Sequence, residues 1–357
     1  MFNKKKVIIL TNQPNQQTSK AVVLTNHKTT QEITKKDQTQ VKKPPAFFRS
    51  LDYVPKRTPL ILELTKHVTL KEMISSGGEG AVYKTDRINK VAKLYHDPTK
   101  RRIYEKVKFL ASIDLNLDSI AKPEDLIYKK NQFQGFTMRN LSGYKTLFFI
   151  TTPARNDFFK EPLTYKFLLR LAIKITDTIA KLHNLGIVIG DIKLQNIMVN
   201  SRGDICFVDI DSIQINSSLL CHTRTFEYQP PETHKDTNFI NKLRYWHYDA
   251  YSTAVLVFQL LTLGTHPYQA RNLGTLDECI KRQYYQYPLP QHDDNLNQNQ
   301  FMIMEIHHMM KKHFSPSIRK FFYNTFRTNG YYYQQTDRKP VSYLHHLLTN
   351  EYYDRNR

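Results

Sequence analysis

Two short segments carry the side chains in this chain that are best suited to chemistry. The first, GDIKLQNIMV, spans residues 190–199 and includes Asp191 and Asn196, and the second, FVDIDS, spans residues 207–212 and includes Asp209. This spacing suits the transfer of a phosphoryl group from a metal-bound nucleotide to a hydroxyl group. Asp191 would accept the proton of the attacking hydroxyl, and Asn196 and Asp209 would bind the metal ions that bridge the phosphates.

A β-hairpin is predicted to bring these two segments together. Strands over residues 197–200 and 204–208 flank the turn Ser201-Arg202-Gly203, so both metal ligands would sit on one rigid element. Two other interpretations stay open. Kinases of small molecules also place an acid and an asparagine in one loop, and Asp and Asn are ordinary turn residues.

A glycine-rich segment upstream, MISSGGEGAVYK, reads as strand, turn and strand over residues 73–84. Gly77, Gly78 and Gly80 lack Cβ atoms, so their main chain could close over phosphate groups. The alternative is a simple hairpin turn.

The next predicted strand, residues 89–95, contains Lys93 among apolar neighbours. A buried lysine needs an anionic partner, which a nucleotide phosphate and a glutamate of the following helix would supply. That helix is predicted over residues 99–113 and offers Glu105. The alternative is a solvated Glu105 that pairs with a nearby lysine or arginine.

These segments together resemble the protein kinase superfamily over residues 60–348. The resemblance implies an α+β, two-lobed fold, with an antiparallel sheet and one regulatory helix in the N-lobe and a mainly helical C-lobe. Within the superfamily, bacterial eukaryotic-type Ser/Thr kinases found with PP2C phosphatases and von Willebrand A proteins in stress or tellurite-resistance systems are most similar to the strings GGEGAVYK, VAKLYHD, GFTM, DIDS and FQLLTLGTHPY.

The resemblance also implies a role for each site residue. Asp191 is the base and Lys193 steadies the γ-phosphate of ATP, while Lys93 and Glu105 position the α- and β-phosphates. The metal ligands, Asn196 and Asp209, would bind Mg²⁺ or Mn²⁺. The residues expected to contact the nucleotide are Gly77, Gly78, Gly80, Val82, Ala92, Lys93 and Met138.

The chain is predicted to divide into four parts. Residues 1–58 form a basic, mostly disordered N-terminal extension, because their composition is too polar to bury a core. The N-lobe follows over residues 59–139 and the C-lobe over residues 140–350. Residues 351–357 are a tail.

Three features of the C-lobe support the resemblance. Thr225 matches the threonine that lies beside the catalytic acid and lysine in Ser/Thr kinases. Glu232 and Arg338 would form a buried ion pair that belongs to a protein-substrate platform. Asp249 begins the apolar segment over residues 249–264 and would steady the catalytic loop, or cap this helix, or do both.

Two residues depart from the kinase pattern. Gly190 replaces an arginine that clamps a phosphorylated activation segment in many kinases, so activity should not require phosphorylation between Ser212 and Thr225. Asp211 replaces a flexible glycine and adds a third carboxylate, which we do not expect to bind metal. No phosphate, metal or proton-transfer residue is lost, which favours catalysis over an ATP-binding pseudokinase scaffold.

The charge of the chain suggests partners besides a protein substrate. Lys and Arg number 52 against 32 Asp and Glu, a net charge of +20. The basic N-terminal extension could bind an acidic membrane lipid, a polyanion or an acidic protein, or it could be a solubilising tail. Nucleic acid binding is not favoured, because the basic and aromatic residues near the C-terminus have helical spacing.

The remaining features favour a cytoplasmic protein. No apolar stretch is long enough for a transmembrane segment or a typical signal peptide. The cysteines Cys206, Cys221 and Cys279 are sparse and unpatterned, which favours a reducing compartment. The alternative is a secreted bacterial effector that acts in the host cytoplasm.

Overall fold

The computed structural model of the protein describes residues 68–115, 117–215, 217, 219–292 and 300–355. The chain divides into two units, residues 1–44 and 45–357, and all described residues belong to the second. The predicted basic extension over residues 1–58 therefore lies outside the described residues.

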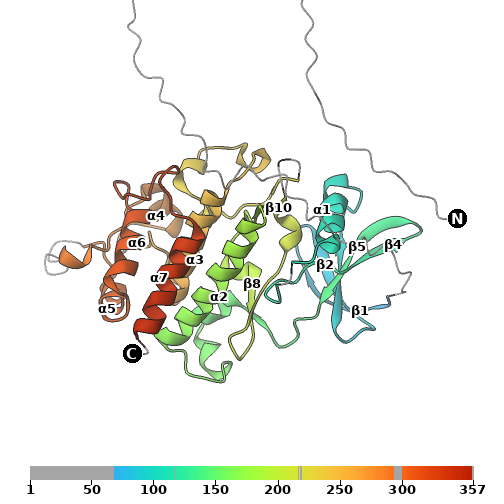
Figure 1. Cartoon of the computed structure of the whole chain (residues 1–357), viewed down its shortest axis with the longest axis horizontal. Helices are drawn as coiled ribbons and strands as arrows, with labels where there is room; N and C mark the ends of the chain where they lie inside the picture. The colour runs from blue at the N-terminus through green and yellow to red at the C-terminus, as the bar shows by residue number, and fades with distance from the viewer. Residues whose placement is uncertain (1–67, 116, 216, 218, 293–299, 356–357) are drawn as a thin grey trace, which may run out of the picture. The chain divides into compact units, whose positions relative to one another are not determined.

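A five-stranded antiparallel sheet forms the N-lobe, with the strand order β1-β2-β3-β5-β4 (Figure 1). Its strands are β1 (Leu70–Ser76), β2 (Gly80–Thr85), β3 (Lys90–Tyr95), β4 (Asp125–Lys129) and β5 (Gln132–Arg139). The predicted strand–turn–strand of the glycine-rich segment and the lysine-bearing strand are confirmed as β1, β2 and β3. The chain leaves β3 into the one helix among the described residues of this lobe.

That helix, α1 (Arg101–Ser112), packs against β4 and β5. It buries Val107 and Leu110, which lie three residues apart and so share one face of the helix. A lysine, Lys106, is buried with them. The rotation of α1 about its axis is therefore set by these apolar contacts with the sheet.

The C-lobe is built around α2 (Tyr165–Asn184). The helix begins where the Thr164 side chain accepts a hydrogen bond from the N–H of Phe167, and Gly186 follows its end with a φ of +73° that favours glycine. The apolar residues that recur along one face of this helix are all buried; they are Leu168, Leu171, Ile175, Ile179 and Leu182.

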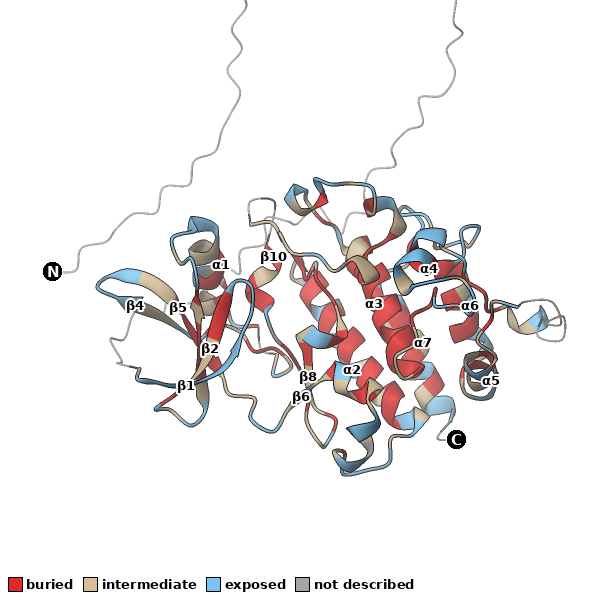
Figure 2. Ribbon diagram, turned by 180° about the vertical axis from the view of Figure 1, so that it is seen from behind, coloured by how far each residue is buried: buried red, intermediate tan, exposed pale blue. Residues whose placement is uncertain are grey.

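A second central helix, α3 (Trp246–Leu261), is buried on nearly every side, as expected for a strongly apolar segment inside a large domain (Figure 2). The other helices of this lobe are α4 (Leu276–Arg282), α5 (Met304–His313), α6 (Pro316–Phe326) and α7 (Val341–Asp354). Helix α7 contacts both α2 and α3, so the three helices share one core.

Two small sheets lie where the catalytic loop was predicted. The strands β6 (Lys145–Thr146), β8 (Ile197–Val199) and β9 (Ile205–Phe207) pair in that order, and β7 (Ile187–Val188) pairs with β10 (Gln214–Ile215). The predicted hairpin is confirmed as β8 and β9. These two sheets fix the two ends of the segment that carries the candidate site.

The α+β fold with an antiparallel sheet in the N-lobe and a mainly helical C-lobe is confirmed. Among the described residues, no helix is both long and apolar enough to cross a lipid bilayer.

Candidate active site

The loop between β7 and β8 is held from below by the buried carboxylate of Asp249 in α3. Its Oδ2 accepts a hydrogen bond of 2.7 Å from the N–H of Ile189, and its Oδ1 accepts one of 2.8 Å from the N–H of Gly190. His183 Nε2 lies 2.9 Å from the same Oδ2. Asp249 is 1% exposed, so these contacts are shielded from water. The predicted role of Asp249 in steadying the loop agrees with this geometry.

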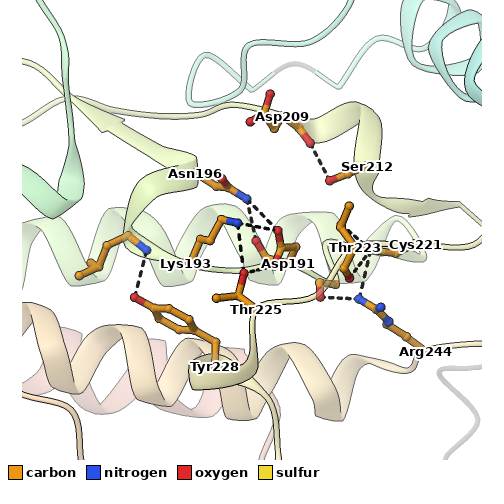
Figure 3. A network of polar contacts seen from close by, with 12 residues as sticks. Asp191, Lys193, Asn196, Asp209, Ser212, Cys221, Thr223, Thr225, Tyr228 and Arg244 are labelled. Carbon is orange, nitrogen blue, oxygen red and sulfur yellow. Dashed lines mark hydrogen bonds and ion pairs between the residues drawn. The ribbon is translucent and has the colours of Figure 1, made fainter. Parts of the chain in front are cut away.

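Asp191 lies at the centre of a short polar network (Figure 3). The Thr225 hydroxyl donates to Asp191 Oδ1 at 2.8 Å, and Lys193 Nζ lies 3.0 Å from Asp191 Oδ2. Lys193 Nζ also donates to Thr225 Oγ1 at 3.1 Å. The structure therefore brings together the acid, the lysine and the threonine that the sequence singled out.

Asn196 joins this network, whereas Asp209 lies apart from it and its main-chain oxygen accepts a hydrogen bond from the Ser212 hydroxyl (Figure 3). The Asn196 Nδ2 donates to the main-chain oxygen of Asp191 at 2.9 Å, a bond that leaves the amide oxygen of Asn196 free to face a ligand. The Asp209 side chain is 53% exposed. A carboxylate and an amide oxygen are the donor types that Mg²⁺ prefers, so these two residues fit a divalent metal ion.

Lys93 is buried on β3 and bound by two carboxylates. Its Nζ donates to Asp209 Oδ1 at 3.0 Å and to both oxygens of Asp211, at 3.0 Å and 2.9 Å. Burial by itself lowers the pKa of this ammonium group, but Asp211 and Asp209 more than offset that, so its pKa lies above the ordinary value. Lys93 is therefore charged and has its anionic partners within the protein.

The partner of Lys93 differs from the sequence prediction. The structure does not bring Glu105 to Lys93: the Glu105 side chain is 43% exposed, and its Oε1 lies 3.7 Å from Arg101 Nε on the same helix. Lys106 faces inward instead and donates to the main-chain oxygen of Ser212 at 3.2 Å. The sequence contained a signal for this arrangement in the apolar spacing of α1. Ile103, Val107 and Leu110 recur at helical spacing, and residue 106 lies on the same face as these three.

Two of the three glycines form an open turn, and the third serves the sheet. The N–H of Gly77 donates to the main-chain oxygen of Gly80 at 2.9 Å, and a Cβ on Gly78 would meet nothing within 4 Å. A Cβ on Gly80 would lie 2.3 Å from the main-chain oxygen of Leu94 on β3. Gly80 is therefore required for the close approach of β2 to β3, whatever it contacts in a ligand.

The strand register separates the residues predicted to line the nucleotide. Val82 lies directly opposite Lys93, so the two share a face of the sheet. Met138 lies opposite Val91, which is two residues before Lys93 and hence on its face. Ala92, which is also expected to contact the nucleotide, is 0% exposed. By the period of two along the strand it lies on the other face of the sheet, whereas Val91 shares the face of Lys93.

Gly190 leaves a space that Arg244 enters from a distant part of the chain. The Arg244 Nη1 donates to the main-chain oxygen of Gly190 at 2.5 Å and lies 3.1 Å from Cys221 Sγ. The φ of Gly190 is +78°, and a Cβ there would lie 2.7 Å from Cys221 Sγ. Gln214 completes the contact, because its side chain bonds both the N–H and the main-chain oxygen of Arg244. The sequence carried no signal for Arg244.

Glu232 and Arg338 form the predicted ion pair. The guanidinium donates to both carboxylate oxygens, at 2.8 Å and 3.2 Å, and the Arg338 side chain is 2% exposed. Arg338 also donates to the main-chain oxygens of His247 and Tyr333. Its positive charge is thus compensated within the fold.

The chain matches the family described as "Protein kinase domain" over residues 68–332. That range contains the described part of the N-lobe, the C-lobe up to residue 332 and every residue proposed to contact nucleotide, metal or the reacting hydroxyl, and it ends before Arg338 and α7.

Two similar curated proteins are the "Protein kinase YegI" of Escherichia coli strain K12 and of Escherichia coli O157:H7. Each is 31% identical, over 208 and 209 residues respectively, which is 56% of this chain and 32% of the relative. The chain thus spans about a third of the length of these relatives. A third, the "Serine/threonine-protein kinase 1" of Heliothis zea nuclear polyhedrosis virus, is 28% identical over 99 residues, 28% of this chain and 35% of that protein.

The family match covers more than half of the chain, and it coincides with a two-lobed fold and with a loop that gathers an acid, a lysine and an asparagine. The chain therefore belongs to the protein kinase family.

Proposed function

We propose that the chain is an ATP-dependent kinase that transfers the γ-phosphate to a Ser or Thr hydroxyl of a protein. The observation that carries this proposal is the contact of Asp191 with both Lys193 and Thr225, with Asn196 bonded to Asp191 in the same loop. Asp209 is bonded to Lys93. The acid, the cation and the candidate metal ligands are of the kinds that phosphoryl transfer requires.

The residues would divide the reaction as follows. Asp191 takes the proton of the substrate hydroxyl as its oxygen bonds to the γ-phosphorus, and the bond from that phosphorus to the β-bridging oxygen breaks, which releases ADP. Lys193 would stabilise the transferred group, and Lys93 would hold the α- and β-phosphates. Asn196 and Asp209 would bind Mg²⁺ or Mn²⁺, which supplies charge neutralisation for the phosphates.

A protein substrate is favoured over a small molecule by the ion pair of Glu232 and Arg338. This pair ties the end of the activation segment to the chain just before α7. Such a tie gives the segment a fixed surface against which a polypeptide could lie, a need that a small substrate does not have.

We also propose that activity does not require phosphorylation of the segment between Ser212 and Thr225. Gly190 provides no guanidinium to bind a phosphate, and Arg244 already occupies its space through Gly190, Cys221 and Gln214. Protein freed of phosphate by a phosphatase should keep its rate of transfer within about twofold. Loss of transfer after that treatment would contradict the proposal.

The closer relationship and the location of the chain are part of the proposal. The YegI relatives support a bacterial kinase. The strings GGEGAVYK, VAKLYHD and DIDS support placement among the bacterial kinases that occur with PP2C phosphatases and von Willebrand A proteins. We propose a cytoplasmic protein, with a secreted effector as the alternative. The basic extension is proposed to bind an acidic lipid, a polyanion or an acidic protein.

The test is to incubate the full chain with γ-labelled ATP, Mg²⁺ or Mn²⁺, and a generic basic protein. We expect label on Ser or Thr of that protein, read by phosphoamino acid analysis after electrophoresis. Label found only in a panel of hydroxyl-bearing metabolites would instead identify a small-molecule kinase. Nucleotide binding without transfer to either class would identify a pseudokinase scaffold and overturn the proposal.

A further inference from the structure

To hold phosphates, the ammonium group of Lys93 must keep one position. The lysine side chain is long and flexible, so it keeps that position only when a fixed group binds its Nζ. A fixed carboxylate near its Nζ would provide that orientation. Three carboxylates come into question, on Glu105, Asp209 and Asp211, and they differ sharply in burial and contact.

Asp211 is the most firmly placed of the three. Its side chain is 3% exposed, and both of its oxygens accept hydrogen bonds from Lys93 Nζ. The hydroxyl of Tyr95, two residues after Lys93 on the same face of β3, donates to Asp211 Oδ2. The Lys93 ammonium also lies 5.6 Å from the centre of the Tyr95 ring. Asp211 is therefore held by two side chains of one strand.

Asp209 has a different environment although it is only two residues away. Its side chain is 53% exposed against 3% for Asp211, and a single oxygen contacts Lys93. Its φ of 55° turns the chain between the two acids. Asp211 thus faces Lys93 in the interior, whereas Asp209 remains exposed enough to bind a metal ion.

Helix α1 cannot supply the partner in its present rotation. Successive residues of a helix point about 100° apart, so an inward Lys106 implies a Glu105 turned away. Lys106 is 5% exposed and its Nζ donates to the main-chain oxygen of Ser212, next to Asp211. The helix therefore contributes a cation that supports the chain around Asp211.

We propose that Asp211, held by Tyr95, is the residue that positions Lys93 for nucleotide binding, in place of Glu105. Asp211 acts on the substrate through Lys93 and is a positioning residue, and this leaves Asp209 available to a metal ion. The inference rests on the proposed kinase function, and its test includes a measurement that needs no turnover.

The first arm of the test compares D211N with E105Q in the full chain. D211N should lower kcat/KM for ATP by about 10²-fold, through a higher KM and a weaker affinity for ADP measured by calorimetry. The fold decrease in kcat/KM for ATP should be at least ten times smaller in E105Q than in D211N. The matched control is D177N, which makes the same change in an exposed carboxylate that pairs with Lys181 on α2. Its rate should equal that of the unaltered chain.

The second arm measures how firmly Lys93 is held, without turnover. D211N replaces one of the two Asp211 oxygens that accept hydrogen bonds from Lys93 Nζ, so the amine is less restrained and an amine-reactive reagent should modify Lys93 several-fold faster at a fixed pH. The rate is read from the Lys93 peptide by mass spectrometry. E105Q should leave this rate unchanged, because Glu105 does not contact Lys93.

The outcomes separate the inference from the proposed function. Absence of transfer by the unaltered chain rejects the kinase proposal, whereas the Lys93 labelling arm still tests Asp211. Equal effects of D211N and E105Q, a larger effect of E105Q, or a gain of activity in D211N would overturn the inference. If D211N does not fold, Tyr95→Phe decides: it removes one hydrogen-bond donor to Asp211 and should raise KM for ATP by about threefold to tenfold. An unchanged KM in that variant would contradict the proposal.

Discussion

The loop that carries Asp191 and the helix that carries Glu105 fix their acidic residues by different means. In the loop, the main chain is bonded to the buried Asp249, and Asp191 itself contacts both Thr225 and Lys193. In α1, the inward-facing side chains, Lys106 among them, are fixed, and Glu105 remains 43% exposed. Hydrogen bonds to the main chain of a loop fix the direction of each of its side chains separately. In a helix, the rotation of the whole helix about its axis decides which side chains face the interior.

The largest effect is expected from replacing Asp191, the proposed proton acceptor in the loop. Asp191→Asn removes the proton acceptor but keeps the size of the side chain, so kcat should fall by about 10²–10⁴-fold. The dissociation constant for ADP should stay within about threefold, because Asp191 is not proposed to hold the nucleotide. Both quantities are measured on one preparation, by labelled phosphate transfer and by calorimetry. Activity near that of the unaltered chain would exclude Asp191 as the base.

A second change breaks the support beneath the loop. Asp249→Asn replaces an acceptor of two main-chain N–H groups by an amide that offers one oxygen, in a site that is 1% exposed. We expect a loss of about 3 kcal/mol in the free energy of unfolding, together with a lower kcat. Urea unfolding followed by circular dichroism measures the first. The matched control is D204N, in an exposed acid of the β8–β9 hairpin, and a similar loss there would remove the special role of Asp249.

The pH dependence of stability sharpens the comparison, because a buried histidine supports the segment that contacts the loop. His266 Nε2 lies 2.9 Å from the main-chain oxygen of Glu227, and burial lowers the pKa of His266 to about 4. In the unfolded chain, His266 binds a proton near the ordinary pKa of 6.5, whereas in the folded chain it stays neutral until the pH nears 4. The stabilisation from neutral His266 is therefore complete above pH 6.5 and is lost as the pH falls towards 4.

The expected size of this effect is on the order of 3 kcal/mol between the two pH limits. It is measured as the urea midpoint across that range. His266→Gln should flatten the dependence, and an equally steep loss of stability in that variant would assign it to other groups. His247, whose pKa burial lowers to about 3, is the next group to replace in that case.

The smallest expected effect tests the helix side. Lys106→Met keeps the length of the apolar part of the side chain but removes the hydrogen bond to the main-chain oxygen of Ser212. Burial lowers the pKa of Lys106, so loss of its charge should cost little, about 1 kcal/mol or less of stability. The loss is measured as the change in the midpoint of thermal unfolding. A loss as large as that of D249N would mean that α1 is fixed by polar contacts as strictly as the loop.

The sequence allowed most of the fold and about half of the site to be predicted, for identifiable reasons. Short-range spacing determines the hairpin that carries Asn196 and Asp209, and the apolar period determines the buried face of α2. Glu105 was assigned to Lys93 by residue type, although the period of α1 puts Lys106 on the inner face. Ala92 was grouped with Lys93 in the same way, although neighbours in a strand alternate between the two faces of the sheet.

Arg244 could not be predicted because no local rule connects it to Gly190. The two residues meet only when the chain beyond the activation segment returns to the loop, and the contact depends on an absent side chain at residue 190. Tertiary packing of this kind leaves no pattern in a single sequence. Glu232 and Arg338, equally distant, were found only through the resemblance to kinases.

The arginine in the space beside Gly190 has a consequence for how the chain could be governed in its cell. In this chain the ordering cation comes from the polypeptide itself, at Arg244, so the working arrangement would be inherited at synthesis and would not await a modifying enzyme. Control of such a protein would then fall on how much is made, how quickly it is degraded, and which substrates it meets. Its output would follow its abundance in direct proportion.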